Sequence, residues 1–151
     1  MGRRLFKELE RSYGFDEVAI VPGQVTINPE LTSTKMNIGN LSFEIPVMAS
    51  AMDGAVSPGF AAYMHEMGGL GVLNAEGLYT RYEDPYSVLE EIISCPQDEV
   101  TSFLQQVYSE PIREELIGQR VREIKNSGAT CAVSFTPQNT KRMSPAAVEA
   151  G

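Results

Sequence analysis

The chain has 151 residues, of which 42% are apolar and 21% are charged, as in ordinary globular proteins. That length suits one domain or part of a larger one. A formal charge of −8 and a pI near 4.7 argue against a nucleic-acid partner, because phosphate binding needs a basic surface.

Composition also argues against membrane insertion, secretion and a metal site. No apolar run approaches the roughly 20 residues that a membrane span requires, and the N-terminus has no apolar signal core. Two cysteines, Cys95 and Cys131, do not make a disulfide framework, so the expected location is the reducing cytoplasm. With one histidine and no Cys-x-x-Cys pair, no His- or Cys-based metal site is expected.

Residues 1–44 are interpreted as an N-terminal arm and hairpin. Within them, residues 15–22 and 36–43 are each expected to form an extended arm or a hairpin. A cluster of basic residues alternates with apolar ones at the start of the chain and is interpreted as a short amphipathic lead-in: Arg3, Arg4, Lys7 and Arg11.

Three apolar runs then predict buried strands, at residues 45–49, 70–74 and 130–135. They are unbroken rather than alternating, which is typical of parallel strands covered on both faces.

Helix signals separate these runs. Ser57-Pro58 and Asp84-Pro85 each place an N-cap residue before a proline at the first helical position. The first of these helices is expected to bury a stripe of Phe60, Met64 and Met67, to leave His65 on the surface and to end at Gly68-Gly69.

Further helices are predicted over residues 98–108 and from about 113 to 127, and a last one from Ser144-Pro145. The alternation of strands and helices predicts an α/β fold with a parallel sheet over residues 45–151. Because three parallel strands leave an open edge, we expect this architecture to be unfinished.

Ligands of parallel α/β folds bind at the carboxyl ends of the strands, which directs attention to residues 50–54, 74–77 and 136–139. After the first strand, Ser50 offers a hydroxyl, Met52 a polarisable thioether and Asp53 a carboxylate. The alternative is a tight turn in which these residues only pack.

After the second strand, Asn74 and Glu76 are expected to point into the same site. Glu76 could contact the ligand or could instead pair with Arg81.

Other features fit catalytic roles less well. The glycines of residues 68–77 enter a strand rather than follow one, so they are not a dinucleotide fingerprint and instead end a helix and allow close packing. Lys141 and Arg142 are expected to be solvated. Neither Cys95 nor Cys131 has a neighbouring base, so neither is expected to be a nucleophile.

The segments "FDEVAIVPG", "IPVMASAMDG" and "MGGLGVLNAEG", in this order and spacing, resemble the opening of the IMP dehydrogenase/GMP reductase family. "GVLNAEGLYTRYEDP", "EPIREELI" and "SFTPQN" resemble its short, IMP dehydrogenase-related branch, which lacks inserted CBS domains. The resemblance covers nearly the whole chain.

This resemblance implies that the chain is the N-terminal portion of a (β/α)8 TIM barrel, with about three β/α units. It also implies that Ser50 and Met52 contact a purine nucleotide, IMP or GMP, with Met52 beside the base; Asp53, Asn74 and Glu76 complete the candidate substrate-binding set. The implied coenzyme is NAD or NADPH, with a possible monovalent cation and a homotetramer in the full-length protein.

The chain departs from the main branches of the family at Asn74-Ala75, where a His-Lys pair is usual. The direction of hydride transfer therefore stays open: oxidation of IMP to XMP with NAD, or reduction of GMP to IMP with NADPH. The family's nucleophilic cysteine is expected beyond Gly151, since a barrel needs roughly 250 residues, so we expect the chain to be inactive alone.

Two other functions are weighed against this one. The chain could be a non-catalytic nucleotide-binding or assembly module, or another TIM-barrel oxidoreductase or phosphate-binding enzyme with a similar strand edge.

Overall fold

The computed structural model describes residues 10–151, so Arg3, Arg4 and Lys7 lie outside the described residues. The chain divides into two compact units, Met1–Ser33 and Thr34–Gly151. The division that we expect between residues 44 and 45 stays a prediction.

The described part of the first unit contains two short 3-10 helices, Phe15–Glu17 and Pro29–Leu31. Phe15–Glu17 is therefore a turn and not the extended arm expected over residues 15–22. The Glu17 carboxylate stabilises this turn by accepting from the Gly14 N–H at 2.8 Å. Every residue from 10 to 33 is exposed, so these residues form no core among themselves.

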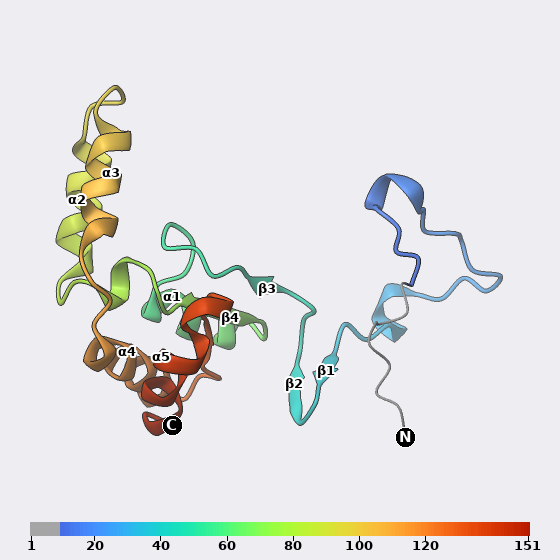
Figure 1. The fold of residues 1–151 in the computed structure, drawn as a ribbon. Coiled ribbons are helices and arrows are strands. Elements are labelled where there is room, and N and C mark those ends of the chain that lie inside the picture. The colour runs from blue at the N-terminus through green and yellow to red at the C-terminus, as the bar shows by residue number, and fades with distance from the viewer. Residues whose placement is uncertain (1–9) are drawn as a thin grey trace, which may run out of the picture. The chain divides into compact units, whose positions relative to one another are not determined.

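The second unit begins with an antiparallel hairpin of β1 (Met36–Ile38) and β2 (Leu41–Phe43), which confirms the hairpin predicted over residues 36–43. It is followed by a three-stranded parallel sheet in the order β3-β4-β5, of which Figure 1 labels β3 and β4. The strands are β3 (Met48–Ala49), β4 (Leu70–Asn74) and β5 (Ala132–Ser134).

Two of these strands are shorter and less covered than the apolar runs suggested. β4 is central and largely buried, as predicted, but Met48 in β3 is half exposed and β5 is only partly buried. β3 and β5 are edge strands, so each pairs on one side only within the described residues. Because Met48 is half exposed and no residue of β5 is fully buried, the expectation of cover on both faces is wrong for these two strands.

Helix α1 (Pro58–Glu66) starts as predicted, with the Ser57 Oγ accepting from the Phe60 N–H at 3.0 Å. Two residues after the helix, the chain turns at Gly68, whose φ of 83° is readily adopted only by glycine. The buried face of α1, however, is centred on Ala61, because a Cβ on Gly71 would lie 2.7 Å from the Ala61 Cα. The predicted stripe is wrong: Phe60 and Met67 are exposed.

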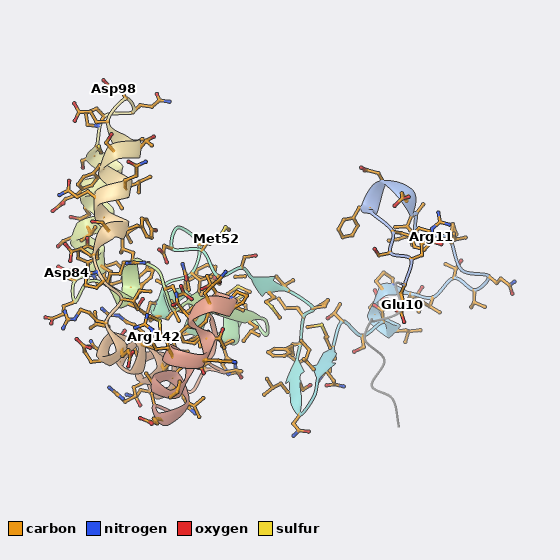
Figure 2. All side chains as sticks on the ribbon, viewed as in Figure 1. Glu10, Arg11, Met52, Asp84, Asp98 and Arg142 are labelled. Atoms are coloured by element: carbon orange, nitrogen blue, oxygen red, sulfur yellow. The ribbon has the colours of Figure 1, made fainter. Side chains whose placement is uncertain are left out.

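Helices α2 (Pro85–Ser94) and α3 (Val100–Ser109) form a helical pair that extends away from the sheet in Figure 1. The Asp84 carboxylate caps α2, as its Asp-Pro signal predicts. Asp98, labelled in Figure 2, lies at the far tip of this pair.

Helix α4 (Glu114–Asn126) buries the apolar face that its periodicity predicts. The core of the second unit forms where this face meets α1, β4 and α5, and fully burying a side chain such as Leu73 or Ile124 contributes about 1.5–3 kcal/mol. Its most deeply buried apolar residues include Val56, Ala61, Leu73, Ile117, Ile124 and Met143.

Helix α5 (Pro137–Glu149) starts earlier than predicted. Thr136-Pro137 is the true start signal, and Pro145 lies inside the helix. Pro145 cannot donate to the carbonyl four residues earlier, but both Pro145 and Lys141 are exposed, so water can satisfy that carbonyl.

No helix formed by residues 10–151 combines the length and the apolar content needed to cross a bilayer.

Candidate functional site

Parallel pairing brings the carboxyl ends of all three strands to one edge of the sheet. Asn74 of β4 is in register with Ser134 of β5, and the Ala75 N–H extends this ladder by donating to the Ser134 carbonyl at 3.0 Å. β3 pairs with β4 in the same direction, Ala49 opposite Gly71. The segments that leave β3, β4 and β5 therefore emerge side by side, where ligands of α/β folds bind.

The loop after β3 presents Ser50 and Met52 to solvent. It is tightly turned: the Met52 N–H donates to the Ser50 carbonyl at 2.8 Å, and the Met52 carbonyl accepts from Ala55 and Val56 at 2.9 Å. The Met52 side chain is 58% exposed, and Figure 2 shows it on the loop between β3 and α1. The Ser50 hydroxyl makes no hydrogen bond to any residue from 10 to 151, so both groups are free for a ligand.

The Asp53 carboxylate is engaged within the protein. Its Oδ2 accepts from the Leu78 N–H at 2.8 Å and from the Tyr108 hydroxyl at 2.6 Å. Its Oδ1 is buried without a hydrogen-bond partner in the described structure. A Cβ on Gly77 would lie 1.9 Å from that oxygen, so only glycine fits at this position.

Asn74 closes the turn after β4. Its Oδ1 accepts from the Glu76 N–H at 3.1 Å, an Asx-type turn that directs the chain out of the sheet. Its side chain is partly buried, and its amide NH2 has no acceptor among residues 10–151.

The Glu76 carboxylate joins the exit of β4 to the start of α5. It accepts from the Thr136 N–H, from the Thr136 hydroxyl at 3.2 Å and from the Asn139 side-chain amide at 2.7 Å. Burial opposes ionisation, but the hydrogen bonds from Asn139 and Thr136 and the charge of Arg81 outweigh it, and the pKa of Glu76 falls below its ordinary value.

Arg81 does not pair with the Glu76 carboxylate, so this alternative for Glu76 is wrong. Its Nε and Nη2 donate instead to the Glu76 backbone carbonyl, at 3.2 and 3.1 Å. Nη1 donates to the Glu110 carbonyl, and the guanidinium lies 5.8 Å from the centre of the Tyr108 ring.

Tyr108 is the residue of this site that sequence reasoning missed. It lies on α3, 55 residues from Asp53 in sequence, and no local pattern connects the two. Burial, the hydrogen bond to Asp53 and the Asp53 charge raise the pKa of Tyr108 well above its ordinary value, so the hydroxyl remains a donor.

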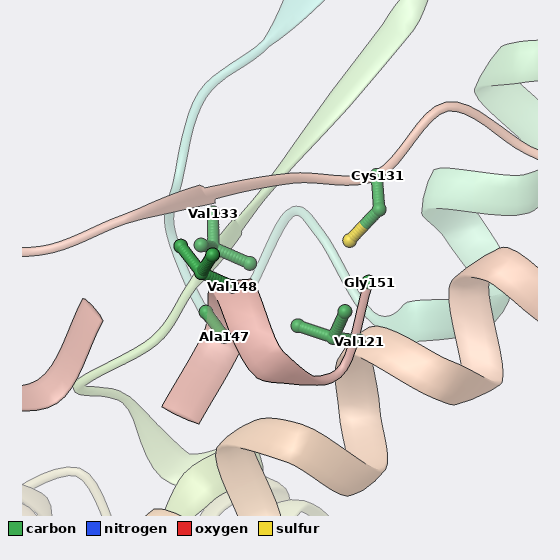
Figure 3. A pocket seen from close by; sticks show the side chains of 6 residues that line it. All are labelled: Val121, Cys131, Val133, Ala147, Val148 and Gly151. Atoms are coloured by element: carbon green, nitrogen blue, oxygen red, sulfur yellow. The ribbon is translucent and has the colours of Figure 1, made fainter. Parts of the chain in front are cut away.

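The two cysteines lie away from these exits. Burial raises the pKa of the Cys131 thiol, and the charge of Lys125 offsets this rise only in part. The raised pKa disfavours the reactive thiolate. The Cys131 sulfur points into an open groove of about 240 Å³ beside β5, which Figure 3 shows together with Val121, Val133 and Val148.

Comparisons with known proteins identify the family. The sequence profile of the IMP dehydrogenase / GMP reductase domain matches residues 12–96. An uncharacterized oxidoreductase of Mycolicibacterium smegmatis is 37% identical over 146 residues, which is 93% of this chain and 39% of that protein. An inosine-5'-monophosphate dehydrogenase of Korarchaeum cryptofilum is 34% identical over 65 residues, 43% of this chain and 14% of that protein.

A solved structure supports the same assignment. The crystal structure of an IMP dehydrogenase/GMP reductase-like protein from Corynebacterium glutamicum matches with a TM-score of 0.84 at 32% identity, over 96% of this chain and 40% of that one. The chain belongs to the IMP dehydrogenase/GMP reductase family, as its motifs predict, and has an α/β fold. It spans 39% of the length of the Mycolicibacterium smegmatis relative.

Proposed function

We propose that the chain forms the first three β/α units of a (β/α)8 barrel and supplies the purine-nucleotide edge of an oxidoreductase. Three features support this: the parallel order β3-β4-β5, the helices between the strands, and the match to a solved family structure, 40% of whose chain this chain covers. The edge of β5 that pairs with no strand in the described part of the chain, and the apolar groove beside it (Figure 3), would receive the next β/α unit.

The observation that carries the nucleotide proposal is the pair of free groups on the loop after β3. A flat purine ring can lie against the Met52 thioether, while the Ser50 hydroxyl donates to or accepts from the nucleotide. The free amide of Asn74 lies at the adjoining strand end and can donate to the same ligand. Asp53 and Glu76 use their carboxylates within the protein, so direct contact of either with the nucleotide stays a prediction.

The proposed reaction is the oxidation of IMP to XMP with NAD and water: the C2–H bond of the purine breaks, its hydride would go to NAD, and an oxygen from water takes its place at C2 with release of a proton. Reduction of GMP to IMP with NADPH is the second candidate, and it ranks second because Asn74-Ala75 replaces the family's usual His-Lys pair, so the part of that lysine in reductase chemistry cannot be carried over. The coenzyme, NAD or NADPH, stays a prediction, and none of the described residues is assigned to it. The catalytic cysteine belongs, in this proposal, to the part of the family's length that the chain does not span.

A cytoplasmic location, a homotetramer and a monovalent-cation requirement stay predictions. A non-catalytic nucleotide-binding module is the alternative if nucleotide binds and no turnover occurs in any longer form of the protein.

The test combines turnover assays with a matched pair of methionine variants. IMP with NAD and GMP with NADPH are assayed for the 151-residue chain and for the protein from its source. We expect no turnover by the chain. Where turnover is found, we expect Met52→Ala to raise KM about tenfold, the loss of about 1.4 kcal/mol of ring contact, and Met67→Ala to leave it unchanged.

Met67 is a suitable control because it is 54% exposed, close to the 58% of Met52, and lies at the other end of α1. Equal effects of the two substitutions, or turnover by the isolated chain, would contradict the proposal.

A further inference from the structure

The Asp53 carboxylate depends on two donors. Its Oδ1 is buried against Gly77 and has no hydrogen-bond partner among residues 10–151, so the hydrogen bonds to Oδ2 from Leu78 and Tyr108 carry its stabilisation. A carboxylate removed from water is costly unless donors compensate, and such charge-assisted bonds are among the strongest in proteins. Losing the Tyr108 hydroxyl would leave the Leu78 N–H as the only donor among the described residues.

Asp53 in turn fixes the loop that carries the free groups. It directly follows Met52, whose carbonyl accepts from Ala55 and Val56 at 2.9 Å. A shift of Asp53 toward solvent would therefore pull on this turn and displace the Met52 thioether.

Arg81 contacts the ring of Tyr108. Its guanidinium lies over the Tyr108 ring and donates to the carbonyl of Glu110, just after α3, and to that of Glu76, just after β4. The end of α3 is thus joined to the exits of β3 and β4 by side chains that do not themselves reach the free groups of Ser50 and Met52.

We propose that Tyr108 is a positioning residue for the strand-exit site: its hydroxyl fixes Asp53, Asp53 fixes the loop of Ser50 and Met52, and Arg81 holds Tyr108 in place. The helical pair α2–α3 is then part of the site's framework, although it lies outside the alternating β/α pattern. The identity of the ligand at this loop rests on the proposed function. The connection from Tyr108 through Asp53 to the loop does not depend on that function.

The test compares Tyr108→Phe with Tyr82→Phe. Tyr82 is a matched control because its hydroxyl also ties α3, donating to the Val107 carbonyl at 2.9 Å, without a hydrogen bond to Asp53 in the described structure. Amide hydrogen exchange is measured without nucleotide. We expect Tyr108→Phe to speed exchange at Leu78, Ala55 and Val56 about tenfold, as for a lost bond to a charged group, and Tyr82→Phe to leave these amides unchanged.

Equal acceleration by both variants would mean a general loosening of α3 and would overturn the proposal, as would no acceleration by Tyr108→Phe. A double-mutant cycle adds a second reading: in an Asp53→Ala background, which has no side-chain acceptor at this position, Tyr108→Phe should have no further effect on these amides. Additive effects would also overturn it.

Nucleotide titration separates this inference from the function on which it builds. We expect the dissociation constants of IMP and GMP to rise about tenfold in Tyr108→Phe and not in Tyr82→Phe. If the unsubstituted protein binds neither nucleotide while the exchange result holds, the proposed function fails and the positioning role stands. If nucleotide binds and the exchange result fails, only the positioning role is overturned.

Discussion

Gly77 is a position where the fold leaves no room for a side chain. A Cβ there would meet the Asp53 carboxylate, so Gly77→Ala must displace either Asp53 or the turn after β4. We expect the free energy of unfolding to fall by about 1–3 kcal/mol, the usual cost of overpacking, in a urea titration. Gly54→Ala is the control, since a Cβ on Gly54 would meet no atom within 4 Å; equal losses in the two variants would contradict the close approach.

Glu76 makes stability depend on acid pH. Its pKa in the folded state lies below its ordinary value of 4.5, so its ionised form stabilises the fold above pH 4.5, and this contribution is lost as pH falls through the folded pKa. Glu76→Gln should lose about 1 kcal/mol at neutral pH, as for a lost helix cap, and should show a weaker fall in stability below pH 4.5.

Thermal melts at neutral and acid pH measure this difference. Glu90→Gln, a change at an exposed glutamate of α2, should leave the pH dependence unaltered. A Glu76→Gln protein that loses stability in acid as steeply as the unsubstituted chain would show that the carboxylate does not anchor α5.

Among the helices, α4 depends on one buried guanidinium. Arg120 is 6% exposed and donates to the carbonyls of Tyr79, Tyr82 and Glu83, so it ties α4 to the segment between β4 and α2. Arg120→Met leaves these acceptors without their donor and should cost about 3 kcal/mol in chemical unfolding. Arg122→Met, at an exposed position of the same helix, should change stability by less than about 0.5 kcal/mol; similar losses from both would contradict this role.

An N-cap residue followed by proline predicted the start of a helix correctly where only one such pair lay near the start. Ser57 and Asp84 cap α1 and α2 as expected, because a cap bonds to amides only two or three residues away. The predicted start of α5 is wrong because Thr136-Pro137 and Ser144-Pro145 give the same signal. A proline inside a helix is tolerated where the carbonyl four residues earlier, which loses its donor, is exposed.

The buried face of α1 could not be predicted from its own periodicity. The apolar stripe of Phe60, Met64 and Met67 suggested one face, but the contact with β4 is made through Ala61 and Gly71, where the absence of a side chain allows close approach. Small residues on a facing strand decide this packing, and they lie outside the window that a helical pattern considers.

For the molecule as a whole, the parallel edge and the exits of the strands followed from the sequence, because unbroken apolar runs between helices specify parallel strands. The family followed from its motifs. The hydrogen bonds that hold the exits did not follow: Asp53 to Tyr108 of α3 and Glu76 to Thr136 each join residues more than 50 positions apart, as tertiary structure alone can show. Sequence reasoning therefore predicted where the strand exits lie but not the hydrogen bonds that hold them.

We propose that the strand exits bind a purine nucleotide with Met52 beside the base. The decisive experiment titrates IMP, and UMP as a pyrimidine control, into protein labelled at its seven methionine methyl groups for NMR. We predict a saturable ring-current shift of the Met52 methyl with IMP and no comparable shift at Met67. No shift at Met52, or equal shifts at Met52 and Met67, would contradict the claim.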